Sequence, residues 1–151
     1  HRRDLLVLPG GDLDTWRPFS ERYKVRFAGR TGYARTALEN RVPIVPFAHA
    51  GAHHTLYVIT DGQRIARALR IHNIARARIF PIHISLPWGL AIGPLPHIPI
   101  PVTLRYRIGE PILPPPELAF DEPVTDAMVL EHDARVRDAV QGLLDRLSRG
   151  E

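Results

Sequence analysis

Proline and glycine interrupt the apolar runs of this 151-residue sequence, which contains 15 prolines and 11 glycines. Proline has no backbone N–H and a fixed φ, so it ends helices and removes hydrogen bonds from sheets. The dense apolar stretch at 79–101 is too broken by proline to form one element. No apolar run approaches the ~20 residues that a membrane-spanning helix needs. The sequence therefore predicts one globular domain built from short elements.

The spacing of apolar residues predicts three strands, and 51–60 is expected to form a loop and a short strand. A continuous apolar run predicts a buried strand at 5–8, ended by a Pro-Gly-Gly turn. A strand near a sheet edge is expected at 42–48, because two prolines there remove donors from the ladder. At 102–108 apolar and polar side chains alternate, which predicts a half-buried strand. Its apolar side carries Val102, Leu104, Tyr106 and Ile108.

Helices are expected between and after these strands. Thr31 is placed to cap a helix that runs to about Asn40, and arginines alternate with apolar residues at helical spacing in 62–74. From about Thr125 the apolar residues again recur at helical spacing, so 125–151 is expected to be an amphipathic helix packed on the body. Residues 12–29 are expected to form a loop, with room for a short strand at 23–27.

Strand–helix–strand order is typical of α/β proteins. We therefore expect a central mixed sheet flanked by helices, with the main unit at 1–112 and a proline-rich connector at 113–124. The sequence begins at His1 without a Met and enters a strand-like run at once. From this we expect the fold to be incomplete at its N-terminus.

Charge is unevenly distributed along the chain, whose formal net charge is +4. Residues 1–80 hold 14 of the 20 basic and 6 of the 16 acidic residues, so they carry +8 and residues 81–151 carry −4. A basic first half suits an anionic partner, such as phosphate, coenzyme A, an acidic lipid headgroup or nucleic acid. No helix-turn-helix, RNA-binding aromatic signature or zinc finger supports nucleic acid, so no nucleic-acid partner is expected. The sequence has no cysteine, which excludes disulfides and cysteine-based zinc sites.

The Pro-Gly-Gly turn at 9–11 is the sharpest candidate for a binding site. Two glycines after a strand let the backbone approach a ligand closely and can expose N–H groups to an anion. Arg17, Arg26 and Arg30 follow within 20 residues, and guanidinium groups bind phosphate in a bidentate manner. The alternative is an ordinary turn beside a solvated basic face. Asp12 is also expected at this turn, where its side chain can cap backbone N–H groups.

Residues 5–112 resemble the later conserved blocks of glycerolipid (PlsC-like) acyltransferases. The order is a strand, Pro-Gly-Gly, an aromatic and basic loop, an Arg-x-Gly-aromatic helix at 30–33, and Val-Pro-Ile-Val-Pro at 42–46. The third block of that superfamily is commonly Glu-Gly-Thr-Arg-like. The Pro-Gly-Gly form is similar to the branch that contains diacylglycerol acyltransferases and their bacterial relatives.

The resemblance implies acyl transfer from acyl-CoA or acyl carrier protein to a lipid hydroxyl, such as that of diacylglycerol or a lysophospholipid. A His in an H-x-x-x-x-D motif would deprotonate the hydroxyl while the Asp orients it. It implies no cofactor beyond the thioester co-substrate, and a place on the cytoplasmic face of a membrane. The implied substrate-binding residues are Gly10, Gly11, Asp12, Arg17, Arg26, Arg30 and Gly32. The implied pocket residues of the fourth block are Val42, Pro43, Ile44, Val45, Pro46, Gly51 and His53.

The catalytic motif itself is absent from this sequence. None of the eight histidines has an Asp five residues later. We therefore expect no turnover from this chain alone, and the alternative function is a non-catalytic lipid- or phosphate-binding module. His49, His53 and His54 form a local cluster, but without Cys or an H-E-x-x-H helix a metal site is not expected there. The segment 64–100, rich first in arginine and then in apolar residues, is a candidate membrane-facing surface, with a solvated helix face as the alternative.

Overall fold

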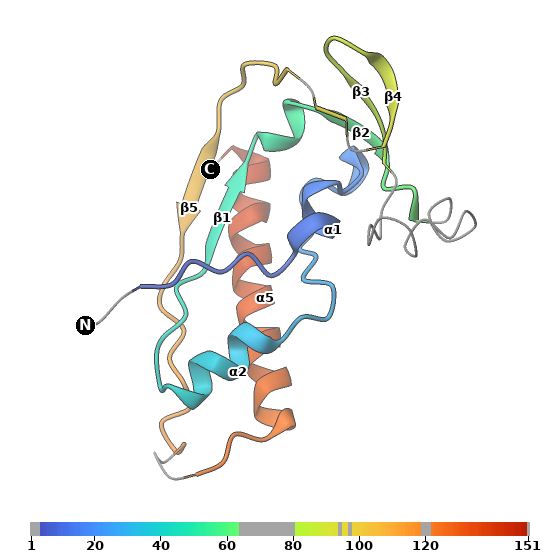
Figure 1. The fold of residues 1–151 in the computed structure, drawn as a ribbon. Helices are drawn as coiled ribbons and strands as arrows, with labels where there is room; N and C mark the ends of the chain where they lie inside the picture. Colours follow the sequence, from blue (N-terminus) through green and yellow to red (C-terminus); the bar gives the residue numbers. More distant parts are fainter. Residues whose placement is uncertain (1–3, 64–80, 94, 97, 119–121, 151) are drawn as a thin grey trace.

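The computed structural model describes residues 4–63, 81–93, 95–96, 98–118 and 122–150. They form a mixed α/β fold, which confirms the predicted class (Figure 1). Instead of the one central mixed sheet that was predicted, these residues form two small sheets in which every pairing is antiparallel. One sheet pairs β1 (Phe47–Ala50) with β5 (Arg105–Ile108), and the other has the order β2-β3-β4.

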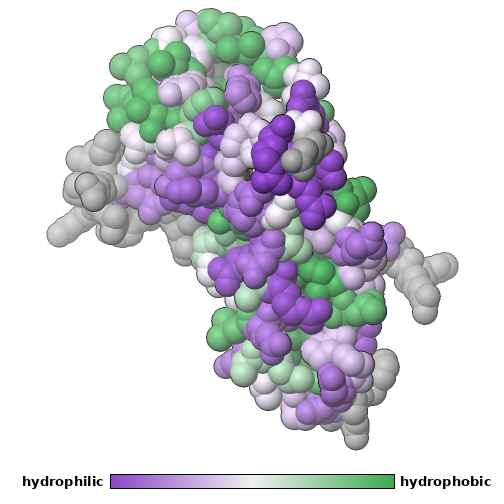
Figure 2. All heavy atoms as spheres, turned by 180° about the vertical axis from the view of Figure 1, so that it is seen from behind, coloured by the Kyte–Doolittle hydropathy of each residue, from purple (hydrophilic) through white to green (hydrophobic). Residues whose placement is uncertain are grey.

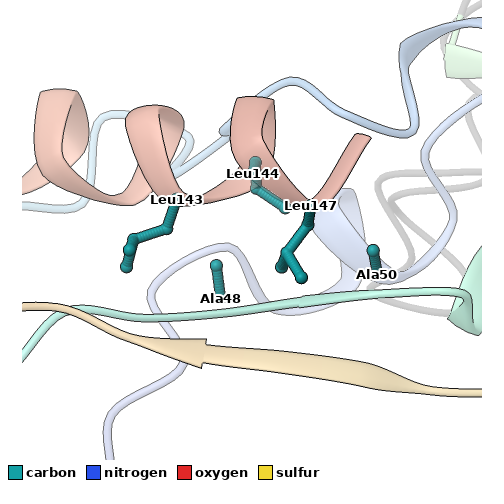
Figure 3. Packing of buried hydrophobic residues seen from close by; sticks show 5 residues of the cluster. All are labelled: Ala48, Ala50, Leu143, Leu144 and Leu147. Carbon is teal, nitrogen blue, oxygen red and sulfur yellow. The ribbon is translucent and has the colours of Figure 1, made fainter. Parts of the chain in front are cut away.

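The long helix α5 (Asp126–Arg149) packs along β1 and β5. The Thr125 hydroxyl accepts a hydrogen bond from the Met128 N–H at its start, and Gly150 ends it in the left-handed conformation. This confirms the helix predicted from Thr125. Leu143, Leu144 and Leu147 meet Ala48 and Ala50 of β1 (Figure 3). The small alanine side chains let the helix lie close to the strand.

The helix α2 (Gly32–Glu39) makes the second core with the other end of α5. Its range confirms the helix predicted at 31–40. Ala34 and Leu38 are fully buried and pack with Val129 of α5. Leu118 from the proline-rich stretch is part of the same cluster. Before α2 lie the short helix α1 (Gly11–Thr15) and the 3-10 turn η1 (Phe19–Glu21). The prediction of a loop at 12–29 is therefore wrong in part, and 23–27 forms no strand.

The second sheet consists of β2 (Tyr57–Thr60), β3 (Ile82–Ser85) and β4 (Gly89–Ile92). The 3-10 turn η2 (Ala52–His54) precedes it, so the loop and short strand predicted at 51–60 are confirmed. Val58, His83 and Ala91 lie opposite one another across the three strands and are buried. The strand period of two therefore turns the intervening apolar side chains outward.

Three strand predictions need correction. Residues 5–8 form no strand, and Leu5 is 80% exposed, because no described strand pairs with this run. In 42–48 the prolines delay the strand, so Ile44 makes one isolated bridge to Ile112 and regular pairing begins at Phe47. The strand predicted at 102–108 is shorter and turned over, because half-buried Arg107 lies opposite Ala48, whose side chain packs against α5. The apolar side chains Leu104, Tyr106 and Ile108 are therefore exposed.

The basic helix predicted at 62–74 lies almost entirely outside the described residues. Within the described part of the chain, no helix combines the length and the apolar composition needed to cross a membrane.

Candidate functional site

The Pro-Gly-Gly turn is packed too tightly for side chains. A Cβ added at Gly10 would lie 2.7 Å from the carbonyl oxygen of Arg26 and closer still to the Cβ of Asp14. Gly11 begins α1 with a φ of +55°, a conformation that favours glycine, and a Cβ there would meet the Arg30 guanidinium. The two glycines therefore let the loop at 26–30 lie directly on the start of α1.

Arg17, which follows α1, is the buried cation of this region. Its exposed fraction is 5%. Its Nη2 lies 3.2 Å from Asp14 Oδ1 and 3.2 Å from His53 Nε2. Its Nε and Nη1 are buried without a hydrogen-bond partner among the described residues. Burial lowers the pKa of Arg17, yet a guanidinium stays charged at neutral pH, so the side chain holds two charged donors without an acceptor among the described residues.

His53 is the acceptor that holds Arg17. It lies in η2 just after Gly51, whose φ is +108° and where a Cβ would clash with the Thr103 carbonyl. Burial and the neighbouring Arg17 charge lower the pKa of His53 to about 4, so the ring is neutral at pH 7. Because a guanidinium only donates, Nε2 must accept and the proton of the neutral ring lies on Nδ1.

Asp14 supplies the negative charge beside Arg17. Burial raises the pKa of Asp14, and the nearby Arg17 and His49 act in the opposite direction. Its side chain is 42% exposed, whereas that of Arg17 is almost wholly covered. Asp14 is partly hydrated and contacts only the Nη2 atom of the guanidinium. Its negative charge therefore offsets the positive charge of buried Arg17 only in part.

The other two predicted cations have structural partners. Arg26 makes ion pairs with Glu21 and, at 3.5 Å, with Asp61. Arg30 Nη1 donates to the carbonyl oxygens of Pro9 and Gly10, at 2.9 Å each. Arg30 therefore holds the turn and Arg26 is paired with acids, whereas two donors of Arg17 have no partner among the described residues.

The predicted fourth block divides into two parts. Gly51 and His53 belong to the Arg17 region, whereas 42–46 lies along 109–112. Ile44 exchanges backbone hydrogen bonds with Ile112, and buried Pro46 accepts one from Gly109. The exposed members of the block are Val42, Pro43 and Val45.

Gly32 and Asp12 complete the predicted set. Gly32 opens α2, and a Cβ there would meet nothing within 4 Å, so close packing does not explain this glycine. Asp12 lies within α1, one residue after Gly11.

Sequence reasoning missed the aromatic and histidine contacts around this site. Trp16 lies 5.5 Å from the ring of His83, which is fully buried on β3 and whose Nε2 donates to the Gly93 carbonyl. Phe19 lies against Tyr57 of β2 and edge-on to His54. The alternation Ile82-His83-Ile84 was the one signal for a histidine on an inner strand face. Among the described residues, no cluster of three or more His, Cys, Asp or Glu side chains is arranged to hold a metal ion.

Comparison with known proteins gives relatives but no family. No family profile and no solved structure matches the sequence. The chain is 30% identical over 145 residues to the uncharacterized protein Rv0502 of Mycobacterium tuberculosis and to the uncharacterized protein ML2427 of Mycobacterium leprae. The match covers 95% of this chain but 37% and 36% of those proteins. The chain therefore spans little more than a third of the length of the curated relatives it matches.

Proposed function

We propose that this chain is part of a membrane-associated acyltransferase of the glycerolipid kind. It would move a fatty acyl group from acyl-CoA or acyl carrier protein to a lipid hydroxyl, such as that of diacylglycerol or a lysophospholipid. In this proposal the chain binds a phosphate group of the donor or of the acceptor. The observation that carries it is buried Arg17, which follows α1 and whose Nε and Nη1 have no partner among the described residues.

A buried guanidinium with two unpartnered donors suits a phosphate. Leaving charged donors in the interior without acceptors is costly, and a phosphate oxygen that accepts from Nε or from Nη1, which lie on different edges of the guanidinium, would reduce that cost. His53, neutral at pH 7, orients the guanidinium without adding a competing negative charge. Asp14 stays on Nη2, so it does not occupy the two donors that the phosphate would use.

The residues that would activate the acceptor hydroxyl lie outside this chain in our proposal. His53 is not suited to be the general base, since its Nε2 is held by Arg17 and the residue five positions later is Val58. The curated relatives are considerably longer than the matched region, which leaves room for a catalytic segment elsewhere in such a protein.

The absence of H-x-x-x-x-D from this sequence favours a second candidate, a non-catalytic lipid- or phosphate-binding module. Both candidates use Arg17 in the same way. They differ in whether an H-x-x-x-x-D motif is encoded before His1. If it is, the extended chain should transfer acyl groups and substitution of that His should abolish transfer. If the motif is not encoded there, the binding module becomes the better account.

The phosphate-binding role is tested by calorimetric titration of the chain with coenzyme A and with pantetheine, which lacks the phosphates. Coenzyme A should bind and pantetheine should bind at least tenfold more weakly. Arg17→Met should weaken coenzyme A binding at least tenfold, because it keeps an apolar stem and removes the donors. Arg135→Gln, on the exposed side of α5, removes the same charge and serves as the control. Equal binding of coenzyme A by the Arg17 variant and the control would exclude this role.

A further inference from the structure

The hairpin of β3 and β4 belongs to a long uncharged segment. Residues 81–104 contain no Asp, Glu, Lys or Arg, although 24% of the whole chain is charged. Strands that face water on one side normally carry polar residues there. Here the outward positions carry Ile84, Leu90 and Ile92, and none of them is covered by another described element. Figure 2 shows the apolar side chains gathered at one end of the molecule.

The register of the sheet fixes which side chains point outward. Val58, His83 and Ala91 occupy the buried face, and Trp16 packs near His83. Their neighbours along each strand must therefore face away from the body. The chain after β4 extends the surface, because Ile98 bridges to Leu86. We call the exposed apolar residues here the hairpin surface: Tyr57, Ile59, Ile84, Leu86, Trp88, Leu90, Ile92, Leu95, Ile98 and Ile100.

Trp88, near the tip of the hairpin, already has its indole N–H hydrogen-bonded within the protein. It is 55% exposed, yet its indole Nε1 donates to the Pro96 carbonyl at 2.6 Å. The ring can therefore leave bulk water without losing a hydrogen bond. Tryptophan is also the residue that most favours the boundary between headgroups and acyl chains.

The charge pattern favours a bilayer over a protein partner. A protein interface usually has a polar rim, whereas no Asp, Glu, Lys or Arg occurs anywhere in 81–104. The 17 residues that precede this segment in the sequence, 64–80, contain five arginines and no acid. Basic residues tethered next to an apolar surface attract anionic headgroups, at about 1 kcal/mol for each residue near the membrane.

We propose that the hairpin surface inserts into the headgroup and acyl boundary of an anionic lipid bilayer. The insertion is shallow, since β4 is an edge strand among the described residues and its outer backbone groups need water at the headgroup level. The inference extends the proposed function and rests on it, because the lipid substrate held in a membrane comes from that proposal. It names the element that brings the Arg17 region to that membrane.

The test is co-sedimentation of the chain with vesicles of phosphatidylcholine alone and with vesicles that contain one quarter phosphatidylglycerol. The chain should bind the anionic vesicles at least tenfold more tightly. Leu90→Asp, at a position 68% exposed, should weaken that binding at least tenfold, and Ile92→Asp provides a second variant. Leu130→Asp, at a position 59% exposed on α5, is the matched control and should bind as the unmodified chain does.

Three results would overturn the inference. The unmodified chain would fail to sediment with anionic vesicles, or the Leu90 and Leu130 variants would bind them equally. The third result is a chain that does not bind vesicles but forms a dimer that Leu90→Asp dissociates. The last result would assign the surface to a second copy of the chain, paired along β4. Coenzyme A titration separates this inference from the proposed function. If the chain binds coenzyme A but not anionic vesicles, only the role of the hairpin is excluded. If it binds anionic vesicles but not coenzyme A, only the role of Arg17 is excluded.

Discussion

The hydroxyl of Tyr33 on α2 donates a 2.7 Å hydrogen bond to Asp133 Oδ1 on α5, joining two residues that are 100 positions apart in sequence. Asp133 is buried and also pairs with Arg137 at 2.9 Å. Burial and the Asp133 carboxylate raise the pKa of Tyr33, so the phenol keeps its proton and remains a donor. The bond therefore fixes α2 on α5 next to the cluster around Leu38.

Removing this hydroxyl should destabilise the fold without changing its packing. We expect Tyr33→Phe to lower the free energy of unfolding by about 2 kcal/mol, since the bond goes to a charged, buried acceptor. Urea unfolding followed by circular dichroism measures the difference. Tyr106→Phe, at an exposed site on β5, is the control and should change stability by less than about 0.5 kcal/mol. If both variants lower the free energy of unfolding equally, the Tyr33 hydroxyl does not stabilise the packing of α2 on α5.

The close approach at Gly10 predicts a position-specific effect of alanine. Gly10→Ala should lower stability by about 2 kcal/mol or more, because the added Cβ overlaps Asp14 and approaches the Arg26 carbonyl. Gly32→Ala opens into free space at the start of a helix and should leave the melting temperature unchanged or raise it slightly. Thermal unfolding of the two variants compares them directly. A Gly10 variant as stable as the Gly32 variant would contradict the packing described for the turn.

Acid should destabilise the protein through two histidines. The pKa of His53 is lowered to about 4, and burial lowers the pKa of His132, whose ring nitrogens have no hydrogen-bond partner among the described residues. In the unfolded chain both titrate near the ordinary value of 6.5, so below that pH the unfolded state binds protons that the folded state does not. Stability should therefore fall as pH drops from about 7 to about 4.

Between pH 7 and 5 His53 should account for about 1 to 2 kcal/mol of this loss, discounted for its partial exposure, and His132 adds to it in the same direction. Urea unfolding at each pH gives the value. His53→Gln keeps an acceptor for Arg17 and removes the titration, so its stability should depend less on pH over this range. An unchanged pH dependence in both His53→Gln and His132→Leu would assign acid sensitivity to other groups.

The contact between α5 and β1 predicts a large cost for a cavity. Leu144→Ala should lower the free energy of unfolding by about 2 to 5 kcal/mol, the usual range for a buried leucine. The exposed Leu130→Ala on the same helix controls for the change in helix propensity. Chemical denaturation of the two variants gives the difference. Similar losses from both would mean that Leu144 does not fill the core.

The helices could be predicted because their signals are local. The spacing around Leu38 and from Thr125 onward lies within the helices themselves, and both predictions are confirmed. The run at 5–8 carried the composition of a buried strand, but burial requires a partner strand, and no local pattern supplies one. The β3–β4 hairpin was not predicted, because prolines interrupt this segment and polar residues do not alternate with apolar ones along it. The two-residue period of a strand was therefore not recognisable in the sequence.

The candidate site depends on partners that are distant in sequence. Arg17 was identified from its position after the turn, but its acceptor His53 lies 36 residues away. Arg26 looked equivalent to Arg17 until Asp61, 35 residues away, was seen to pair with it. Sequence spacing could therefore name the cations of the region. Only the fold shows that Arg30 bonds to the turn, that Arg26 pairs with acids, and that two donors of Arg17 have no partner among the described residues.

The helix α5 contributes to both hydrophobic clusters, with Val129 in one and Leu143, Leu144 and Leu147 in the other. It also follows every strand and every other described helix in the sequence. A ribosome therefore releases α2 and the β1–β5 pair before the element that covers them has been made. Neither cluster can close during synthesis until α5 emerges, so this chain should acquire its stability late and in one step.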